Sequence, residues 1–331
     1  MRRFARAKSV AAPRATRSVP SASSDEGGWD PPSGVQLVLF GGKGGVGKTT
    51  CAAAAALRLA RHRQRVLLLS TDPAHSLGDV FDVTLSDEPR EVAERLVARE
   101  LDANRAFAAQ RDQYRRSVDE LFEAVRGGSQ LDAPFDRVVV QDLIDLAPPG
   151  LDELFALFAV IEALQKGYDL VVADTAPTGH SLRLLELPKK ALGWVHALLA
   201  ILLKYRRVIG LGDLARSLTA AARDLRELQS LLRDPRRTLF VPVTRAAALP
   251  RVETERLLAA LRRLRIPCGP AIVNALTPPG CQRCRRAAAA EKRQVAALRR
   301  RTPAMLGAPA VVPAPRGVRA LLAFSRTWTP R

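Results

Sequence analysis

The sequence predicts an α/β fold, a doubly wound and mostly parallel sheet with an inserted α-helical subdomain. Three short apolar runs carry this prediction, at Val35–Phe40, Arg65–Ser70 and Tyr168–Ala173. Continuous apolar runs of this length are typical of parallel strands that helices cover on both faces. Each run ends in a glycine-rich or acidic segment, and the carboxyl ends of such strands are where doubly wound sheets bind ligands. Two further strands are expected at Thr238–Val243 and Gly269–Asn274.

A glycine-rich turn follows the first strand and precedes an alanine-rich helix, which is the setting that a phosphate-binding loop requires. Glycines let backbone N–H groups converge on phosphate oxygens, and the helix N-terminus adds partial positive charge there. Lys48 is expected to reach the β- and γ-phosphates, and the Thr49 hydroxyl to ligate Mg²⁺. The class is therefore a P-loop NTPase, whose predicted nucleotide contacts are Gly42, Lys43, Gly44, Gly45, Val46, Gly47, Lys48, Thr49 and Thr50.

Two aspartates stand at the ends of the second and third strands. Asp72 is placed to order the attacking water near the γ-phosphate, and the alternative is that it only caps the following turn. Asp174 is expected to hold Mg²⁺, through water. The segment after Asp174 has the character of a switch, with Thr178, Gly179 and His180 as its candidate residues. His180 either relays the loss of the γ-phosphate or serves as a capping or core side chain.

The composition is strongly basic, with 52 Lys and Arg against 33 Asp and Glu, a net charge of +19. A GC-rich coding bias without functional content is one candidate source of part of this excess. No aromatic-interleaved basic patch appears, so we expect no nucleic-acid partner. No apolar run reaches the roughly 18–20 residues that a membrane span needs, and the expected location is the cytoplasm.

The chain divides into a basic tail and one ATPase domain. Residues 1–33 predict a disordered tail, and their arginine- and serine-rich, acid-poor composition also suits a transit peptide, which would place the protein in an organelle stroma or matrix. Residues 34–331 form the P-loop domain, with helical insertions at about 90–150 and 188–232. Amphipathic helices are expected from about Glu91, with Val92 and Leu96 on an apolar face. The leucine-rich second insertion either packs within the domain or lines a groove for something hydrophobic.

Four cysteines fall into two groups. Cys51 and Cys268 stand alone in apolar runs and are expected in the core. Cys281 and Cys284 supply half of a tetrahedral zinc site, so either a symmetry-related subunit completes the site or the pair is redox-active. Asn274, at the end of a strand, is a candidate for hydrogen bonding to an adenine edge, and Pro313 completes the candidate nucleotide contacts.

These motifs resemble the ArsA family of arsenical pump-driving ATPases and the ATPases that guide tail-anchored membrane proteins. The resemblance covers nearly everything from Gln36 to Phe324. Its single ATPase unit makes the chain more similar to the targeting ATPases than to two-repeat pump ATPases. The segments that carry the resemblance are Gly42–Thr49, Asp72–Ser76, Asp174–Arg183, and Val273-Asn274 followed by Cys281–Cys284.

The resemblance implies a homodimer that hydrolyses ATP with Mg²⁺. Lys43 would cross the dimer interface to the partner's nucleotide, which makes it catalytic together with Lys48 and Asp72. The residue matching Asn274 contacts adenine in that family, and the pair matching Cys281 and Cys284 shares one Zn²⁺ between two protomers. One departure is Ala247, where the family often carries a glutamate.

The expected function is an ATP-hydrolysing dimeric switch that handles a membrane-protein client. Besides a second copy of the chain, the expected partner is a hydrophobic membrane-protein client or a membrane pump or receptor. Two alternatives stay open. The first is the ATPase subunit of an arsenite efflux pump, and the second is a regulatory ATP-binding switch without a transport role. The chain holds only Met1 and Met305, whereas the client groove of eukaryotic targeting ATPases is methionine-rich.

Overall fold

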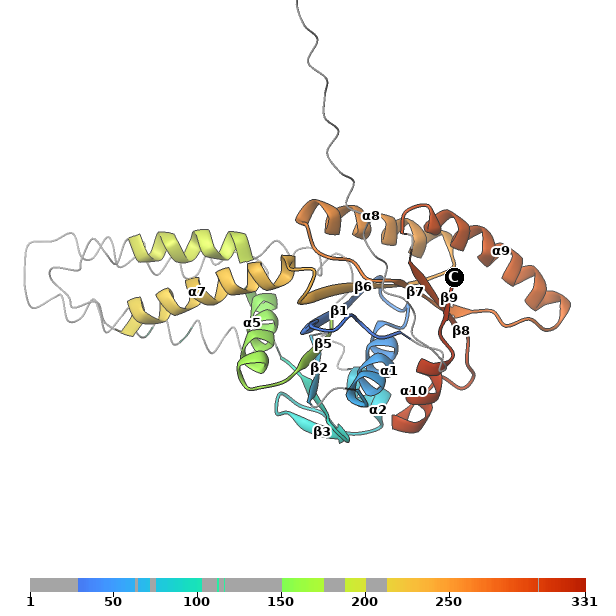
Figure 1. Cartoon of the computed structure of the whole chain (residues 1–331), viewed down its shortest axis with the longest axis horizontal. Coiled ribbons are helices and arrows are strands. Elements are labelled where there is room, and N and C mark those ends of the chain that lie inside the picture. Colours follow the sequence, from blue (N-terminus) through green and yellow to red (C-terminus); the bar gives the residue numbers. More distant parts are fainter. Residues whose placement is uncertain are drawn as a thin grey trace, which may run out of the picture.

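A computed structural model gives the fold and describes residues 29–62, 65–71, 76–102, 112, 116, 151–175, 188–200, 213–302 and 304–331. One nine-stranded sheet runs through it in the order β3-β4-β2-β5-β1-β6-β7-β8-β9 (Figure 1). Only the edge strands β3 and β9 pair antiparallel with their neighbours. The predicted α/β class with a mostly parallel sheet is confirmed. The strands are β1 (Leu37–Gly41), β2 (Val66–Ser70), β3 (Arg90–Ala93), β4 (Leu96–Glu100), β5 (Leu170–Asp174), β6 (Thr238–Arg245), β7 (Ala271–Leu276), β8 (Met305–Pro309) and β9 (Thr329–Pro330).

Helices cover both faces of the sheet (Figure 1). One face packs against α1 (Lys48–Ala60), α2 (Ser76–Phe81) and α10 (Gly317–Arg326). The other face packs against α5 (Leu151–Gln165), the helical segment 188–200, α7 (Asp213–Arg233) and α8 (Ala248–Leu264). The basic helix α9 (Gln282–Arg299) lies beside α8 and contacts β7. This two-sided cover explains why β1, β2 and β5 are buried at every position.

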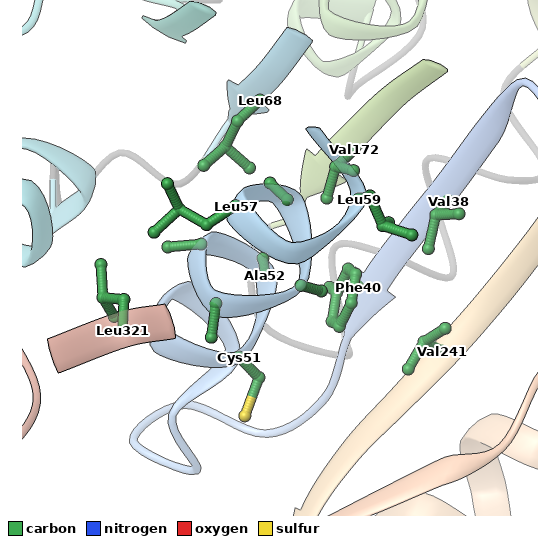
Figure 2. Packing of buried hydrophobic residues seen from close by; sticks show 14 of the residues in the cluster. Val38, Phe40, Cys51, Ala52, Leu57, Leu59, Leu68, Val172, Val241 and Leu321 are labelled. Atoms are coloured by element: carbon green, nitrogen blue, oxygen red, sulfur yellow. The ribbon is translucent and has the colours of Figure 1, made fainter. Parts of the chain in front are cut away.

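Helix α1 is the central helix of the first face. Its alanine run, residues 52–56, is fully buried, and small side chains let the helix approach both the sheet and α10 closely. Figure 2 shows Leu57 and Leu59 of α1 among Val38, Leu68 and Val172 of the strands beneath. Burial of leucine side chains contributes about 1.5–3 kcal/mol each. The packing anchors the first turn of α1, which carries Lys48 and Thr49.

The predicted helix at residues 91–100 is wrong, because β3 and β4 form there. Leu96 and Ala98 are buried while Val97 and Arg99 are half-buried, which is the alternation of a strand. β4 pairs in parallel with β2, and this pairing overrides the helical spacing seen along the chain. Of the rest of the first insertion, only residues 101, 102, 112 and 116 are described, and 112 and 116 are helical.

The described part of the leucine-rich second insertion contributes side chains to the core. Val195 and Leu198 are buried, and they belong to the same cluster as Leu218 and Leu225 of α7. The described residues therefore support packing within the domain. Residues 201–212 of this insertion lie outside them.

The predicted boundary of the tail lies a few residues too late. Arg58 of α1 forms an ion pair with Asp30 at 3.0 Å, and Trp29 packs against the first face. Residues 29–33 are thus attached to the domain, while residues 1–28 lie outside the described part. No helix in the described residues combines the length and apolarity that would let it cross a membrane.

Candidate functional site

The loop between β1 and α1 passes so close to its neighbours that only glycine fits at two positions. A Cβ on Gly42 would lie 2.1 Å from the carbonyl oxygen of Val243 in β6. A Cβ on Gly47 would lie 2.2 Å from Nδ2 of Asn274 in β7. Gly47 also has φ +92°, a left-handed conformation that L side chains rarely adopt. β6 and β7 therefore hold the loop from outside, with its backbone N–H groups at the N-terminus of α1.

Lys48 and Thr49 form the first turn of α1, as the motif predicts. Lys48 is buried, with only 5% of its surface exposed. The Thr49 hydroxyl lies 3.1 Å from the hydroxyl of Ser76, the first residue of α2. Two hydroxyl oxygens this close together suit a hard cation such as Mg²⁺, which prefers oxygen ligands.

Asp174 ends β5 at the same edge of the sheet. In the strand register it stands beside Phe40 of β1 and Ser70 of β2, so its carboxylate lies close to the loop. The backbone there is tied down, because Thr71 N–H donates to the Asp174 carbonyl at 3.0 Å and the Thr175 hydroxyl donates to the Phe40 carbonyl at 2.8 Å. Asp174 is fully buried, so its carboxylate suits a bound cation.

Asp174 lies close enough to Cys51 of α1 for its negative charge to influence the pKa of the thiol. Burial raises the pKa of the Cys51 thiol above its ordinary range, and the nearby negative charge of Asp174 raises it further. Cys51 is therefore a neutral core residue, as predicted. It is a residue of α1 itself and belongs to the same buried cluster as Phe40 and Val241 (Figure 2).

Asn274 holds the phosphate loop from β7. Its Nδ2 donates to the Val46 carbonyl at 2.8 Å, and its Oδ1 accepts from the Ala275 N–H at 2.8 Å. The predicted adenine contact of Asn274 stays a prediction. The loop contact is an additional role that sequence reasoning missed, because Val46 and Asn274 are 228 positions apart.

Lys43, at the head of the loop, forms an ion pair with Glu253 of α8 at 3.6 Å. Both side chains are about one-third to one-quarter exposed, at 31% and 26%. An ion pair of this kind is worth about 0–1 kcal/mol, so it does not prevent Lys43 from moving to another anion.

Glu100 supports the site from β4, and sequence reasoning did not select it. Its Oε1 accepts hydrogen bonds from the backbone N–H groups of Leu77 at 2.8 Å and Gly78 at 3.0 Å. These bonds satisfy the start of α2 and so position Ser76 opposite Thr49. The available signal was a carboxylate shortly after the apolar residues Leu96–Ala98.

Cys281 and Cys284 lie together at the start of α9, with their sulfurs 3.3 Å apart. Cys281 caps the helix by accepting from the Cys284 N–H, and this bond, with the Cys284 thiol, lowers the pKa of Cys281. The pKa of Cys284 is raised, chiefly by the same thiol contact. No third potential ligand joins the pair in the described part of the chain. Cys268 is exposed, so its predicted core position is wrong.

Several candidate residues lie elsewhere. Asp72 and the switch candidates Thr178, Gly179 and His180 lie outside the described residues. Pro313 is exposed in the loop between β8 and α10. Ala247 precedes α8 and makes no side-chain cap there.

Comparison with known proteins gives consistent matches. Residues 35–302 match the family described as anion-transporting ATPases. The ATPase GET3B of Arabidopsis thaliana is 34% identical over 291 residues, covering 78% of this chain and 69% of the plant protein. The ATPase GET3 of Malassezia globosa is 37% identical over 273 residues, covering 76% and 77%. The ATPase asna-1 of Caenorhabditis elegans is 31% identical over 279 residues, covering 76% and 79%.

Proposed function

The chain belongs to the family of anion-transporting ATPases, and from this premise we propose that it is a Mg²⁺-dependent homodimer that couples ATP hydrolysis to handling a membrane-protein client. The ATPase activity follows from the family. One observation carries the nucleotide site: the glycine loop, the Thr49–Ser76 hydroxyl pair and the buried Asp174 converge on one edge of the sheet.

The residues fit a nucleotide with its magnesium ion. The loop N–H groups and Lys48 bind the β- and γ-phosphates, while Thr49 and Asp174 would hold Mg²⁺, directly or through water. The ion supplies charge neutralisation at the phosphates. Asp72 orients the attacking water, and Lys43 leaves Glu253 to reach the partner's nucleotide. Catalysis then depends on positioning and electrostatics.

Asp72→Asn should lower ATP turnover at least a hundredfold, because the amide no longer accepts a proton from the attacking water. Asp79→Asn is the matched control, since Asp79 is exposed on α2 and lies outside the proposed machinery. Steady-state phosphate release measures turnover, and titration with a fluorescent ATP analogue checks that binding persists. Near-normal turnover in Asp72→Asn would disprove the role.

The Cys281–Cys284 pair fits half of a shared zinc site. Two thiol sulfurs 3.3 Å apart supply two of four tetrahedral ligands, and the same pair from a second subunit would complete the set. Zinc content of one ion per dimer in the wild type, lost in Cys281→Ser, would support this arrangement. Two ions per dimer, or none, would contradict it.

A second candidate is the drive subunit of an arsenite pump, which the description of the matching family favours. Arsenite should then stimulate ATP turnover, and Cys281→Ser should abolish the stimulation. Under the client proposal, a purified single-span membrane protein should instead bind and leave on hydrolysis in the wild type but stay bound in Asp72→Asn. Absence of both effects would favour a regulatory ATP-binding switch.

A further inference from the structure

Helix α9 carries a dense strip of positive charge. Its 18 residues include six cationic side chains, and all six are exposed. Within the part of the chain that the structure describes, none of the six forms an ion pair. The cations are Arg283, Arg285, Arg286, Lys292, Arg293 and Arg299.

Glu291, the acidic residue of α9, does not neutralise these exposed cations, because it lies on the side of the helix that faces the domain. Glu291 turns toward the preceding loop, where it accepts hydrogen bonds from the Thr277 N–H at 2.9 Å and the Thr277 hydroxyl at 2.6 Å. On the same inner side Val295 and Leu298 pack against β7 and β8. The helix is thus fixed to the domain in one orientation, beside α8 in Figure 1.

The outer cations follow the helical repeat. Arg285 and Lys292 are seven residues apart, as are Arg286 and Arg293, so each pair repeats after two turns on one side of the helix. The exposed Ala289 lies between the two rows. The strip is about 20 Å long from 285 to 299 at 1.5 Å per residue. Its small central side chain lets a flat partner approach the cations closely.

We propose that this strip binds the anionic surface of a lipid bilayer. The two rows of cations form a convex surface that complements a planar negative one, and clusters of four to eight Lys and Arg on a helix provide such attraction. Single-stranded nucleic acid is less suited, because α9 has no aromatic side chain on which bases stack. The inference depends on α9 alone, so it stands or falls separately from the client role.

The test is flotation of the full chain with vesicles of neutral lipid and of neutral lipid containing about 30% phosphatidylserine. The probe variant is R285Q/K292Q/R293Q. The matched control is R61Q/K190Q/R319Q, which removes the same charge from exposed positions on other elements. Both variants keep the basic residues 1–28, so the tail contributes equally.

We expect capture by anionic vesicles at low salt and a partition coefficient about a hundredfold lower in the probe variant, because each basic residue contributes about a factor of five. The control should lose less than about threefold, and ATP turnover should match the wild type in both variants. Equal capture by neutral vesicles, or equal losses in probe and control, would overturn the proposal. So would binding of a DNA duplex through α9 without capture by vesicles.

Discussion

Gly47 and Asn274 show how closely single residues define this site. A Cβ at position 47 would lie 2.2 Å from Asn274 Nδ2, and the backbone there has φ +92°. We expect Gly47→Ala to weaken ATP binding at least thirtyfold, because left-handed strain costs about 1–2 kcal/mol and the overlap about 1–3 kcal/mol. Titration with a fluorescent ATP analogue measures the change.

A double-mutant cycle with Asn274 separates the two costs of Gly47→Ala, the overlap of its Cβ with the Asn274 side chain and the strain of the left-handed backbone. Asn274→Ala alone loses the hydrogen bond to the Val46 carbonyl, about 1 kcal/mol, and should weaken binding about fivefold. In the Gly47→Ala background the same change removes the overlap, so the double variant should bind more tightly than Gly47→Ala. Simple additivity of the two losses would show that the close approach does not exist in solution.

The thiol of Cys281 should react at lower pH than an ordinary cysteine thiol. The Cys284 N–H and thiol lower the pKa of Cys281, so its thiolate persists to lower pH than an ordinary cysteine with a pKa of about 8.5. After chelator treatment, iodoacetamide should therefore label Cys281 with a half-maximal rate below that pH, and buried Cys51 should stay unlabelled. Peptide mass spectrometry identifies the labelled position.

Cys284 provides the control for this prediction. Cys284→Ser keeps a hydroxyl donor to Cys281, whereas Cys284→Ala removes the donor. The half-maximal pH should rise in Cys284→Ala and change less in Cys284→Ser. Labelling that is indifferent to both substitutions would show that the contact does not set the pKa of Cys281.

A carboxylate from strand β4 holds the start of helix α2. Glu100→Gln replaces a charged acceptor of two backbone N–H groups by a neutral one. The free energy of unfolding should fall by about 1–3 kcal/mol, since hydrogen bonds to charged groups are worth about that much. Denaturant unfolding measures stability, and magnesium titration of turnover tests whether Ser76 and Thr49 stay paired.

Glu88→Gln is the matched control, because Glu88 is exposed and lies in the loop before β3. It should leave both stability and magnesium dependence unchanged. A Glu100→Gln protein with wild-type stability would mean that α2 holds its position without this cap. Loss of stability with unchanged magnesium dependence would confine Glu100 to a structural role.

The Lys43–Glu253 ion pair bears on the whole molecule, since the proposed dimer needs Lys43 elsewhere. Glu253→Gln removes an intramolecular partner worth at most about 1 kcal/mol per subunit. The dimer with a non-hydrolysable ATP analogue and magnesium should therefore tighten by up to about thirtyfold. Analytical ultracentrifugation measures the dimer dissociation constant.

Two further variants serve as controls for the dimerisation measurement. Lys43→Ala should remain monomeric with the analogue, whether or not Glu253 is present. Lys190→Ala, an exposed lysine outside the loop, should dimerise like the wild type. Full turnover by a protein that stays monomeric with ATP would remove the basis for any role of Lys43 across an interface.

Local patterns in the chain were enough to predict the parallel sheet, the phosphate loop and the Lys48–Thr49 pair. Each depends on residues that are close in sequence, where the apolar run, the glycines and the helix start constrain one another directly. The same local reasoning placed a helix at 91–100, because residue spacing alone does not show that β2 offers an open edge to β4. It also left Leu198 undecided between groove and core.

The tertiary structure decided the contacts between residues that are far apart along the chain. Asn274 against Val46, Glu253 against Lys43 and Glu100 beneath α2 each join segments from different elements. A polar side chain has several partners within reach of its chemistry, and only the packed sheet selects one of them. The sequence by itself therefore predicted the phosphate loop, because the residues of that loop are neighbours in the chain, while the fold determined which distant residues hold the loop in place.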